Sequence, residues 1–372
     1  MSYGDYPVLK GVRKILVVKL RHLGDVLLTG PVFSALKKHL PEAKIDSLVY
    51  EESIPMLSGH PAVDRLIGYD RRWKRLGFFS KLRKEWALLR KIRKEGYDLV
   101  LNLTEGDRGA LVAKLSRARV RVGFEPKGKW QKKIYTHVVK HCPGLRHTVE
   151  RNLDALRRIG IFPGEEDRDL FLEVPESAKG TVRERLGEDP FILIHPTSRW
   201  MFKCWPVDKM RKLAEELIRR GKRLVFTSGP AEAELKMLAE IGEGLDVVNL
   251  GGKISLKELA ALIERSEFLV CVDSVPFHMA SALKKPVVAI FGPTSDVTWG
   301  PWRNPKARIV AQNFSCRPCY QDGCGGSKLS DCLYTLPVSQ VLEAIDSLES
   351  EIFPEIGASR LGIAKEFIHC SR

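Results

Sequence analysis

Short apolar runs alternate with segments of helical spacing along most of this chain. Residues 14–20 (KILVVKL) and 97–103 (YDLVLNL) have the length and apolar content of buried strands, and the apolar residues between them recur every three or four positions, as in helices. The same alternation restarts at residues 191–195 (FILIH) and 223–227 (RLVFT). Strands that alternate with helices predict parallel sheets, so the fold class we expect is α/β with two doubly wound, Rossmann-like domains.

A segment rich in Pro, Gly, Glu and Asp, residues 162–190, separates the two series of elements. The chain has 372 residues, which is long for one domain and ordinary for two. We therefore expect an N-terminal domain at residues 1–175, a C-terminal domain at 176–350 and a tail at 351–372. Two such domains would face each other across a cleft, where the carboxyl ends of both sheets converge.

The stretch at residues 267–294 predicts one βαβ unit, with a strand that stops at Asp273 and a short helix at residues 278–283. Ligands of open parallel sheets bind outside the carboxyl ends of the strands, which is where Asp273 and Ser274 stand. A helix N-terminus beside small hydroxyl residues suits a phosphate. The same two residues could instead only cap the helix.

Two other predicted strands are followed by residues with candidate chemistry. Asp25, one residue after a glycine, stands at the head of a helix, where its carboxylate could act as a general base or cap the helix. Thr197 and Ser198 follow the strand that opens the second domain, and Lys203 comes shortly after them. Hydroxyl donors and a point charge are what a diphosphate needs.

Small or donor residues thus stand at four strand ends of the second domain, which predicts a nucleotide-diphosphate site. The set comprises Thr197, Ser198, Gly229, Ser274 and Gly292. Neither GxGxxG nor GxxxxGK[ST] is present, which argues against a Rossmann dehydrogenase and a P-loop ATPase.

The net charge of +15 implies an anionic partner, which could be nucleic acid, an acidic membrane surface or a phosphorylated substrate. Eleven Lys or Arg fall at residues 71–95, against two acids. Apolar residues recur there at helical spacing, and a basic amphipathic helix of this kind can lie on a membrane. We expect the apolar stripe to pack on its own domain instead, with the surrounding charge facing a membrane or an acceptor. The stripe comprises Phe78, Phe79, Leu82, Trp86, Leu89 and Ile92.

No apolar run is long enough to span a bilayer and the first residues have no apolar signal core, so we expect a cytosolic protein. Four of the eight cysteines are clustered, with the spacing Cys316-x2-Cys319-x4-Cys324-x7-Cys332. This spacing could suit a structural zinc, a pair of disulfides or reduced thiols.

Four segments carry a family resemblance when they are taken in order. They are KILVVKLRHLGDVLLTGPVFSALKKHLP, HPTSRWMFKCWP, VDSVPFHMASALKKPVVAIFGPT and CRPCYQDGC with its following Cys. Together they resemble glycosyltransferase family 9, the lipopolysaccharide heptosyltransferases, and the second segment is most similar to the heptosyltransferase III type. The resemblance spans residues 12–348.

The resemblance implies a GT-B fold, in which two Rossmann-like domains hold the active site between them. It also implies an inverting, metal-independent transfer of L-glycero-D-manno-heptose from ADP-heptose to the inner core of lipopolysaccharide, with no cofactor. The N-terminal domain would bind the acceptor and the C-terminal domain the nucleotide sugar.

Catalytic roles are implied by the same resemblance. Asp25, the Asp of the family's GD motif, would deprotonate the acceptor hydroxyl as that oxygen attacks the anomeric carbon. Lys203, which precedes Trp-Pro, would neutralise charge on the departing ADP. Thr197 and Ser198 are expected on the diphosphate.

The remaining nucleotide-sugar positions are also implied by the resemblance. An acid in the helix after the third strand would bind ribose; Glu232 and Glu234 both fit, and we prefer Glu232. Ile254 is expected beside adenine. Val275-Pro276 stands where many members have Gly, which changes how the backbone approaches the phosphates or the sugar. The family's D-[TS]-G-x-x-H motif falls here on Asp273, Ser274 and His278.

The implied acceptor is an anionic core glycolipid at the membrane surface, so the enzyme would be cytoplasmic and peripherally associated with the inner face of the inner membrane. Basic residues of the first domain are candidate acceptor contacts, although each could also be a solvated surface charge. They are Arg72, Arg75, Arg121, Lys127 and Lys129.

Two alternatives stay open. The same fold could use another nucleotide-activated sugar, because these motifs do not separate adenine from uracil pockets. A basic nucleic-acid-binding protein is the alternative of another class, and its affinity would fall steeply with salt. The basic runs contain no identifiable recognition element, so we expect no nucleic-acid partner.

Overall fold

The structure, a computed structural model, describes residues 6–126 and 128–353. The elements of the first half are β1 (Lys14–Lys19), α1 (Leu23–Leu27), α2 (Gly30–His39), β2 (Lys44–Tyr50), η1 (Glu51–Met56), β3 (Arg65–Tyr69), η2 (Arg71–Arg75), α3 (Phe78–Glu95), β4 (Leu99–Asn102), α4 (Asp107–Ser116), β5 (Val120–Phe124), α5 (Lys129–Lys132), β6 (His137–Val139), α6 (Thr148–Arg157) and η3 (Glu166–Arg168).

The elements of the second half follow after a connecting segment. They are α7 (Glu176–Leu186), β7 (Ile192–His195), η4 (Met201–Lys203), α8 (Val207–Arg219), β8 (Leu224–Phe226), α9 (Glu232–Gly242), β9 (Val248–Asn249), α10 (Leu256–Arg265), β10 (Leu269–Val272), α11 (Val275–Ala282), β11 (Val287–Ile290), β12 (Ala307–Val310), η5 (Cys324–Gly326), α12 (Asp331–Tyr334) and α13 (Val338–Ile352).

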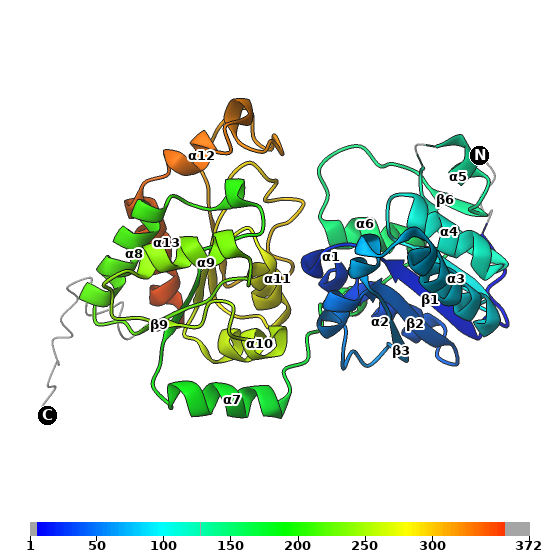
Figure 1. Cartoon of the computed structure of the whole chain (residues 1–372), viewed down its shortest axis with the longest axis horizontal. Coiled ribbons are helices and arrows are strands. Elements are labelled where there is room, and N and C mark those ends of the chain that lie inside the picture. The colour runs from blue at the N-terminus through cyan, green and yellow to red at the C-terminus, as the bar shows by residue number, and fades with distance from the viewer. Residues whose placement is uncertain (1–5, 127, 354–372) are drawn as a thin grey trace, which may run out of the picture.

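Each half forms one six-stranded parallel sheet with helices packed around it (Figure 1). The strand orders are β3-β2-β1-β4-β5-β6 and β12-β11-β10-β7-β8-β9. Both orders place the first strand of the half beside its fourth strand, where the direction of winding reverses. The prediction of two doubly wound α/β domains is therefore confirmed.

The central strand β1 shows why the sequence folds in this way. Ile15 and Val17 join the apolar core on one face of the sheet, whereas Leu16 and Val18 join the core on the other face. All four side chains are fully buried. A strand covered on both faces needs a continuous apolar run, which the sequence supplies at this point.

Hydrogen bonds tie the two halves together. The backbone N–H of Thr148 donates to the carbonyl of Thr298 at 3.0 Å, and Trp302 Nε1 donates to the carbonyl of Arg168 at 2.6 Å. At another point, Lys257 Nζ donates to the carbonyl of Ser58 at 3.3 Å. Helix α1, which follows β1, packs against α11, which follows β10, so the carboxyl edges of the two sheets face each other.

Two predictions about local structure are wrong. The helix predicted from residue 278 begins at Val275, because Pro276 fits the first turn, where the missing N–H has no intrahelical acceptor to lose. The apolar stripe of α3 does not pack on its domain over most of its length, and only Ile92 is buried. Helical spacing shows that residues share a face of the helix; it does not show what covers that face.

In the described part of the chain, no helix is both long enough and apolar enough to cross a bilayer.

Candidate active site

The first sheet presents one acidic side chain toward the second half. Asp25 lies in the first turn of α1, directly after the loop that leaves β1, and its side chain is partly exposed. His22 caps this helix through its backbone position only, without a side-chain hydrogen bond. The carboxylate therefore has access to a substrate at the carboxyl edge of the sheet.

A buried lysine lies close to this carboxylate. Lys19, the last residue of β1, donates from Nζ to the carbonyl of Leu103 and to Asn152 Oδ1, both at 3.2 Å. Burial lowers the pKa of Lys19 to about 8, and the charge of Asp25 acts in the opposite direction. A pKa near 8 leaves the Lys19 ammonium group mostly protonated at neutral pH, so a positive charge is buried beside Asp25.

In the second sheet, the switch point between β7 and β10 carries a buried ion pair. Lys203 Nζ donates to Asp273 Oδ2 at 2.7 Å, and Thr294 Oγ1 donates to the same oxygen at 2.6 Å. The side chain of Asp273 is only 4% exposed, against 18% for Lys203. The lysine is thus oriented by a fixed carboxylate and remains partly exposed.

A second acid organises the loops after β7 and β8. Glu234 Oε2 accepts hydrogen bonds from Thr197 Oγ1 at 2.9 Å and from the backbone N–H of Gly229 at 3.1 Å. A Cβ on Gly229 would lie 2.6 Å from Glu234 Oε1, so only glycine lets the acid come this close. Glu232, which the sequence analysis prefers, is exposed, and the geometry favours Glu234 as the acid of this site.

The other predicted nucleotide-site residues lie on loops at the same edge. Ser198 is buried, and its backbone N–H donates to Cys204 Sγ at 3.2 Å. Ser274 is the N-cap residue of α11, but its hydroxyl donates back to the carbonyl of Val272 and does not cap the helix. Ile254 is half-buried in the loop between β9 and α10.

His278 joins the two halves of the site. A Cβ on Gly24 would lie 2.7 Å from His278 Cδ2, so the backbone of α1 rests directly on the imidazole ring. Burial lowers the pKa of His278; the carboxylate of Asp273 raises it, the charge of Lys203 lowers it and the carboxylate of Asp25 raises it, so groups of both sheets act on this ring. Its Nδ1 is buried and has no hydrogen-bond partner among the residues that the structure describes.

A second bridge crosses the cleft nearby. Arg199 Nη1 donates to His22 Nδ1 at 3.1 Å, which requires a neutral imidazole. Burial and the charge of Arg199 both lower the pKa of His22, so the neutral form is favoured. The Trp200 ring lies perpendicular to the same imidazole, with the ring centroids 6.5 Å apart.

A hollow of about 330 Å³ opens at the carboxyl ends of β1, β2 and β4, beside the loop that carries Asp25. Its lining includes Arg21, Tyr50, Glu105 and Arg108. Arg21 Nη2 reaches Glu105 Oε2 at 3.4 Å, an exposed contact that an anionic ligand could replace. These residues were not predicted from the sequence, where the Arg next to the Gly-Asp loop is their only signal.

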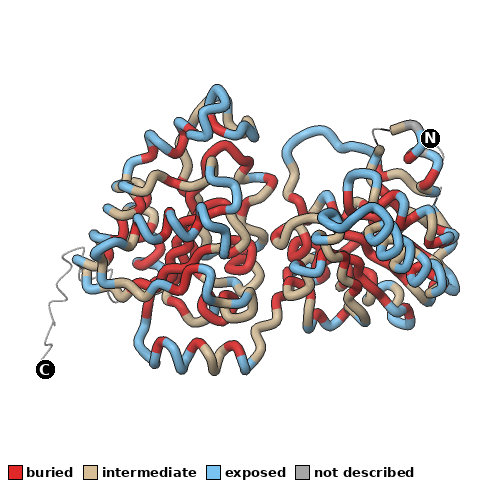
Figure 2. The backbone as a smooth tube through the Cα atoms, in the orientation of Figure 1, coloured by how far each residue is buried: buried red, intermediate tan, exposed pale blue. Residues whose placement is uncertain are grey.

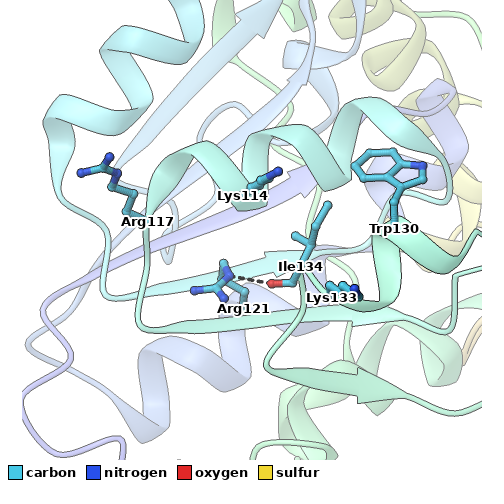
Figure 3. Close-up of a pocket in the computed structure, with 6 residues that line it drawn as sticks. All are labelled: Lys114, Arg117, Arg121, Trp130, Lys133 and Ile134. Carbon is cyan, nitrogen blue, oxygen red and sulfur yellow. Dashed lines mark hydrogen bonds between the residues drawn. The ribbon is translucent and has the colours of Figure 1, made fainter.

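The predicted acceptor cations are not brought together. Arg72 is exposed and pairs with Asp70 at 2.9 Å, and Arg75 is exposed on the same short helix η2. Arg121 lines a separate hollow of about 710 Å³, where its Nε donates to the carbonyl of Ile134 at 2.7 Å (Figure 3). Lys127 lies outside the described residues, and the side chain of Lys129 is not described either.

Register explains why Arg121 stays away from the cleft. It pairs with Val100, which in turn pairs with Leu16, three residues before the end of β1. Arg121 therefore lies toward the amino edge of the sheet, whereas Asp25 lies at the carboxyl edge.

The cysteine loop folds over the end of β11. The backbone N–H groups of Cys319 and Tyr320 donate to the carbonyl of Pro293, and Leu333 packs where a Cβ on Gly292 would stand. In residues 6–126 and 128–353, no three His, Cys, Asp or Glu side chains are placed to hold a metal ion, so the zinc alternative has no support. All four clustered cysteines, including Cys316, Cys324 and the buried Cys332, are free thiols.

The site therefore combines a carboxylate on one sheet with a cation, buried hydroxyls and a helix N-terminus on the other. Such an arrangement can deprotonate one substrate while it holds the diphosphate of a second. Two facing Rossmann-like domains with this division of labour define a glycosyltransferase of the GT-B fold.

Comparisons with known proteins agree with this class. The profile of glycosyltransferase family 9 (heptosyltransferase) matches residues 85–329. Lipopolysaccharide heptosyltransferase 3 of Escherichia coli K12 is 35% identical over 346 residues, which cover 90% of this chain and 98% of that protein. The chain thus belongs to glycosyltransferase family 9, and it is an enzyme of the glycosyltransferase class.

Solved structures show the same fold. A family 9 glycosyltransferase from Veillonella parvula superposes with a TM-score of 0.77 at 23% identity, over 91% of this chain and 97% of that one. The Escherichia coli ADP-heptose lipopolysaccharide heptosyltransferase II superposes with a TM-score of 0.74 at 24% identity, over 92% and 99% of the two chains. The predicted GT-B fold is confirmed.

Proposed function

We propose that this enzyme is an inverting, metal-independent heptosyltransferase, which transfers L-glycero-D-manno-heptose from ADP-heptose to the inner core of lipopolysaccharide. The observation that carries the proposal is the contact of Gly24 with His278, which brings Asp25 of the first sheet close to the Lys203–Asp273 pair of the second. The names of the family 9 relatives support the choice of donor and acceptor.

In the proposed reaction, Asp25 takes the proton from an acceptor hydroxyl, whose oxygen attacks the anomeric carbon of the donor. The bond to ADP breaks on the opposite face, so the configuration at that carbon is inverted. Lys203 neutralises the negative charge on the departing diphosphate. Asp273 and Thr294 orient Lys203 for this role, and charge neutralisation by the lysine would make a divalent metal unnecessary.

The nucleotide is proposed to lie along the loops after β7, β8 and β10. Ser198 would donate to the diphosphate, and Ile254 would pack beside adenine. Thr197 and the N–H of Gly229 would donate to the diphosphate only on giving up their hydrogen bonds to Glu234. Glu234 would bind ribose or hold Thr197 and Gly229 in position, because it is the buried acid of this cluster. Pro276 replaces one N–H in the first turn of α11, which leaves fewer backbone donors for the phosphates.

On the first sheet, the hollow beside Asp25 is proposed to receive the acceptor sugar. Arg21 and Arg108 would contact its anionic groups, and Arg72 and Arg75 lie after β3 at the same edge. We further propose that the enzyme works in the cytoplasm, against the inner face of the membrane that carries the acceptor.

The test is a donor panel with a delipidated core oligosaccharide as acceptor. ADP-heptose should yield product detected by mass spectrometry, whereas UDP- and GDP-sugars should not, and a chelator should leave the rate unchanged. Transfer from a UDP- or GDP-sugar alone would leave the fold assignment unchanged but would show that ADP-heptose is not the donor. Activity that is lost with the chelator and restored by magnesium would contradict metal independence.

A further inference from the structure

The first half of α3 exposes large apolar side chains that no described residue covers. Phe78 and Phe79 are 72% and 83% exposed, and Leu82 and Trp86 are 50% and 58% exposed. Figure 2 shows most of the tube over this helix as exposed. Apolar residues gathered on one exposed element mark an interaction surface more often than isolated ones do.

Helical spacing groups these side chains with cations. Phe79, Leu82 and Trp86 are separated by three and four residues, so they share one face of the helix. Arg83 and Arg90 each follow an aromatic residue of this face by four positions and therefore flank it. The result is an apolar strip bordered by guanidinium groups.

The charge of α3 is not neutralised locally. The helix carries seven Lys or Arg and two acids, and both acids form contacts with residues of other elements. Glu85 accepts from the hydroxyl of Tyr69 at 2.7 Å, and Glu95 pairs with Arg65 at 2.8 Å. Within the described residues, none of the seven cations of α3 forms an ion pair.

A hollow of about 750 Å³ lies on the exposed side of the same helix. Its lining includes Arg83, Trp86, Arg90 and Lys94. Three cations around an exposed indole match an interface in which a phosphate headgroup meets hydrocarbon, because Trp prefers that boundary and the cations attract the phosphate.

The position of α3 relates this surface to the active site. Strands β3 and β4 are parallel, so the helix that connects them begins at the carboxyl edge of the sheet and ends at the amino edge. Phe78 and Phe79 therefore stand at the edge that carries Asp25. A flat surface that meets the first turns of α3 would lie beside the acceptor side of the cleft.

We infer that the apolar strip of α3 (Phe78, Phe79, Leu82 and Trp86) and its flanking cations dock the enzyme on a bilayer that contains anionic phospholipid. Charge complementarity selects this occupant, since the strip is bordered by unpaired cations and an apolar protein partner would leave them without counter-charges. The inference rests on the proposed function in one respect, that the acceptor is held in a membrane.

Docking is tested by sedimentation with vesicles, in the absence of donor and acceptor. The full chain should bind vesicles of equal parts phosphatidylglycerol and phosphatidylcholine, bind phosphatidylcholine vesicles far less, and lose affinity as salt rises. The double variant Arg83→Gln/Arg90→Gln should bind about 25-fold more weakly, at about fivefold for each cation near the surface. Phe79→Ser/Trp86→Ser should lose at least tenfold.

Leu329→Ser is the matched control, because Leu329 is 63% exposed on the other domain and should leave vesicle binding unchanged. All variants should still transfer heptose to the delipidated acceptor, which separates docking from the proposed function and shows that they are folded. Unchanged vesicle binding in both double variants would overturn the inference. Variants that change the oligomeric mass, or the binding of an RNA oligonucleotide, without changing vesicle binding would also overturn it.

Discussion

The contact between Gly24 and His278 offers a direct way to perturb the junction of the two domains. An Ala at position 24 places its Cβ 2.7 Å from His278 Cδ2, whereas ordinary contacts begin at 3.4 Å. The buried imidazole cannot swing into solvent, because His278 is only 5% exposed. Helix α1 and the ring must therefore separate by about 0.7 Å, which moves Asp25 relative to the nucleotide site.

Two effects on stability oppose each other in Gly24→Ala. Replacing a helical Gly by Ala stabilises a fold by about 0.5–1 kcal/mol, whereas overpacking costs about 1–3 kcal/mol. We expect a net loss of up to about 2.5 kcal/mol in the free energy of unfolding. Turnover should fall much further, by about 10- to 100-fold, because misplacement of a reacting group by about 1 Å can cost 10²-fold.

Gly180→Ala is the matched control for this variant. Gly180 lies inside α7, and a Cβ there would meet nothing within 4 Å. This variant should gain about 0.5–1 kcal/mol and keep its kcat. Urea unfolding and steady-state kinetics measure both quantities. If Gly24→Ala is stabilised like the control and turns over at the wild-type rate, then α1 and α11 do not pack in this way during catalysis.

Two further predictions follow from other contacts of the site. Glu234→Ala should raise the Kd for ADP by about 10-fold or more, because Thr197 and Gly229 lose a charged acceptor worth about 1.5–3 kcal/mol, and tenfold in Kd is about 1.4 kcal/mol. Glu232→Ala should change the Kd for ADP by no more than about twofold. Calorimetry that finds the larger effect in Glu232→Ala would instead assign ribose binding to Glu232. His147 accepts from the N–H of Val149 through Nδ1 and contacts the carbonyl of Gly300 through Nε2, and burial lowers its pKa to about 4. The unfolded chain binds this proton below about pH 6.5 and the folded one only near 4, so stability should fall as pH drops across that window, by about 1.4 kcal/mol for each unit of the pKa difference. His147→Asn keeps the cap without the titration, so unfolding curves at several pH values should show a smaller fall; equal slopes would contradict this role.

Much of the fold could be predicted because strands buried on both faces of a parallel sheet appear in the sequence as continuous apolar runs. Strand β12 was not predicted because it lacks such a run. It lies at the edge of its sheet, where Ala307, Arg308 and Ile309 are only half-buried and need not be apolar. The stripe of α3 was misjudged because periodicity identifies a face of a helix but not its neighbour.

The candidate site was predictable where a motif fixes a strand end, as at Asp25 and Asp273. Glu234 could not be chosen over Glu232 from the sequence, since only the turn before α9 decides which acid points inward. Lys19 could have been predicted as a buried cation, because it is a lysine inside an otherwise apolar run. Thr294 stands at the next strand end in the sequence pattern, but its hydrogen bond to Asp273, 21 residues away, forms only through the sheet and could not be predicted.

The measurement that tests the central claim most directly compares heptose transfer and ADP affinity in the wild-type enzyme and in Asp25→Asn. Loss of a general base should lower kcat by about 10²–10⁴-fold. The Kd for ADP should stay unchanged, because the nucleotide is assigned to the other domain. Wild-type turnover in Asp25→Asn would contradict the account, and so would a parallel loss of ADP binding, since either result would separate Asp25 from the role of base.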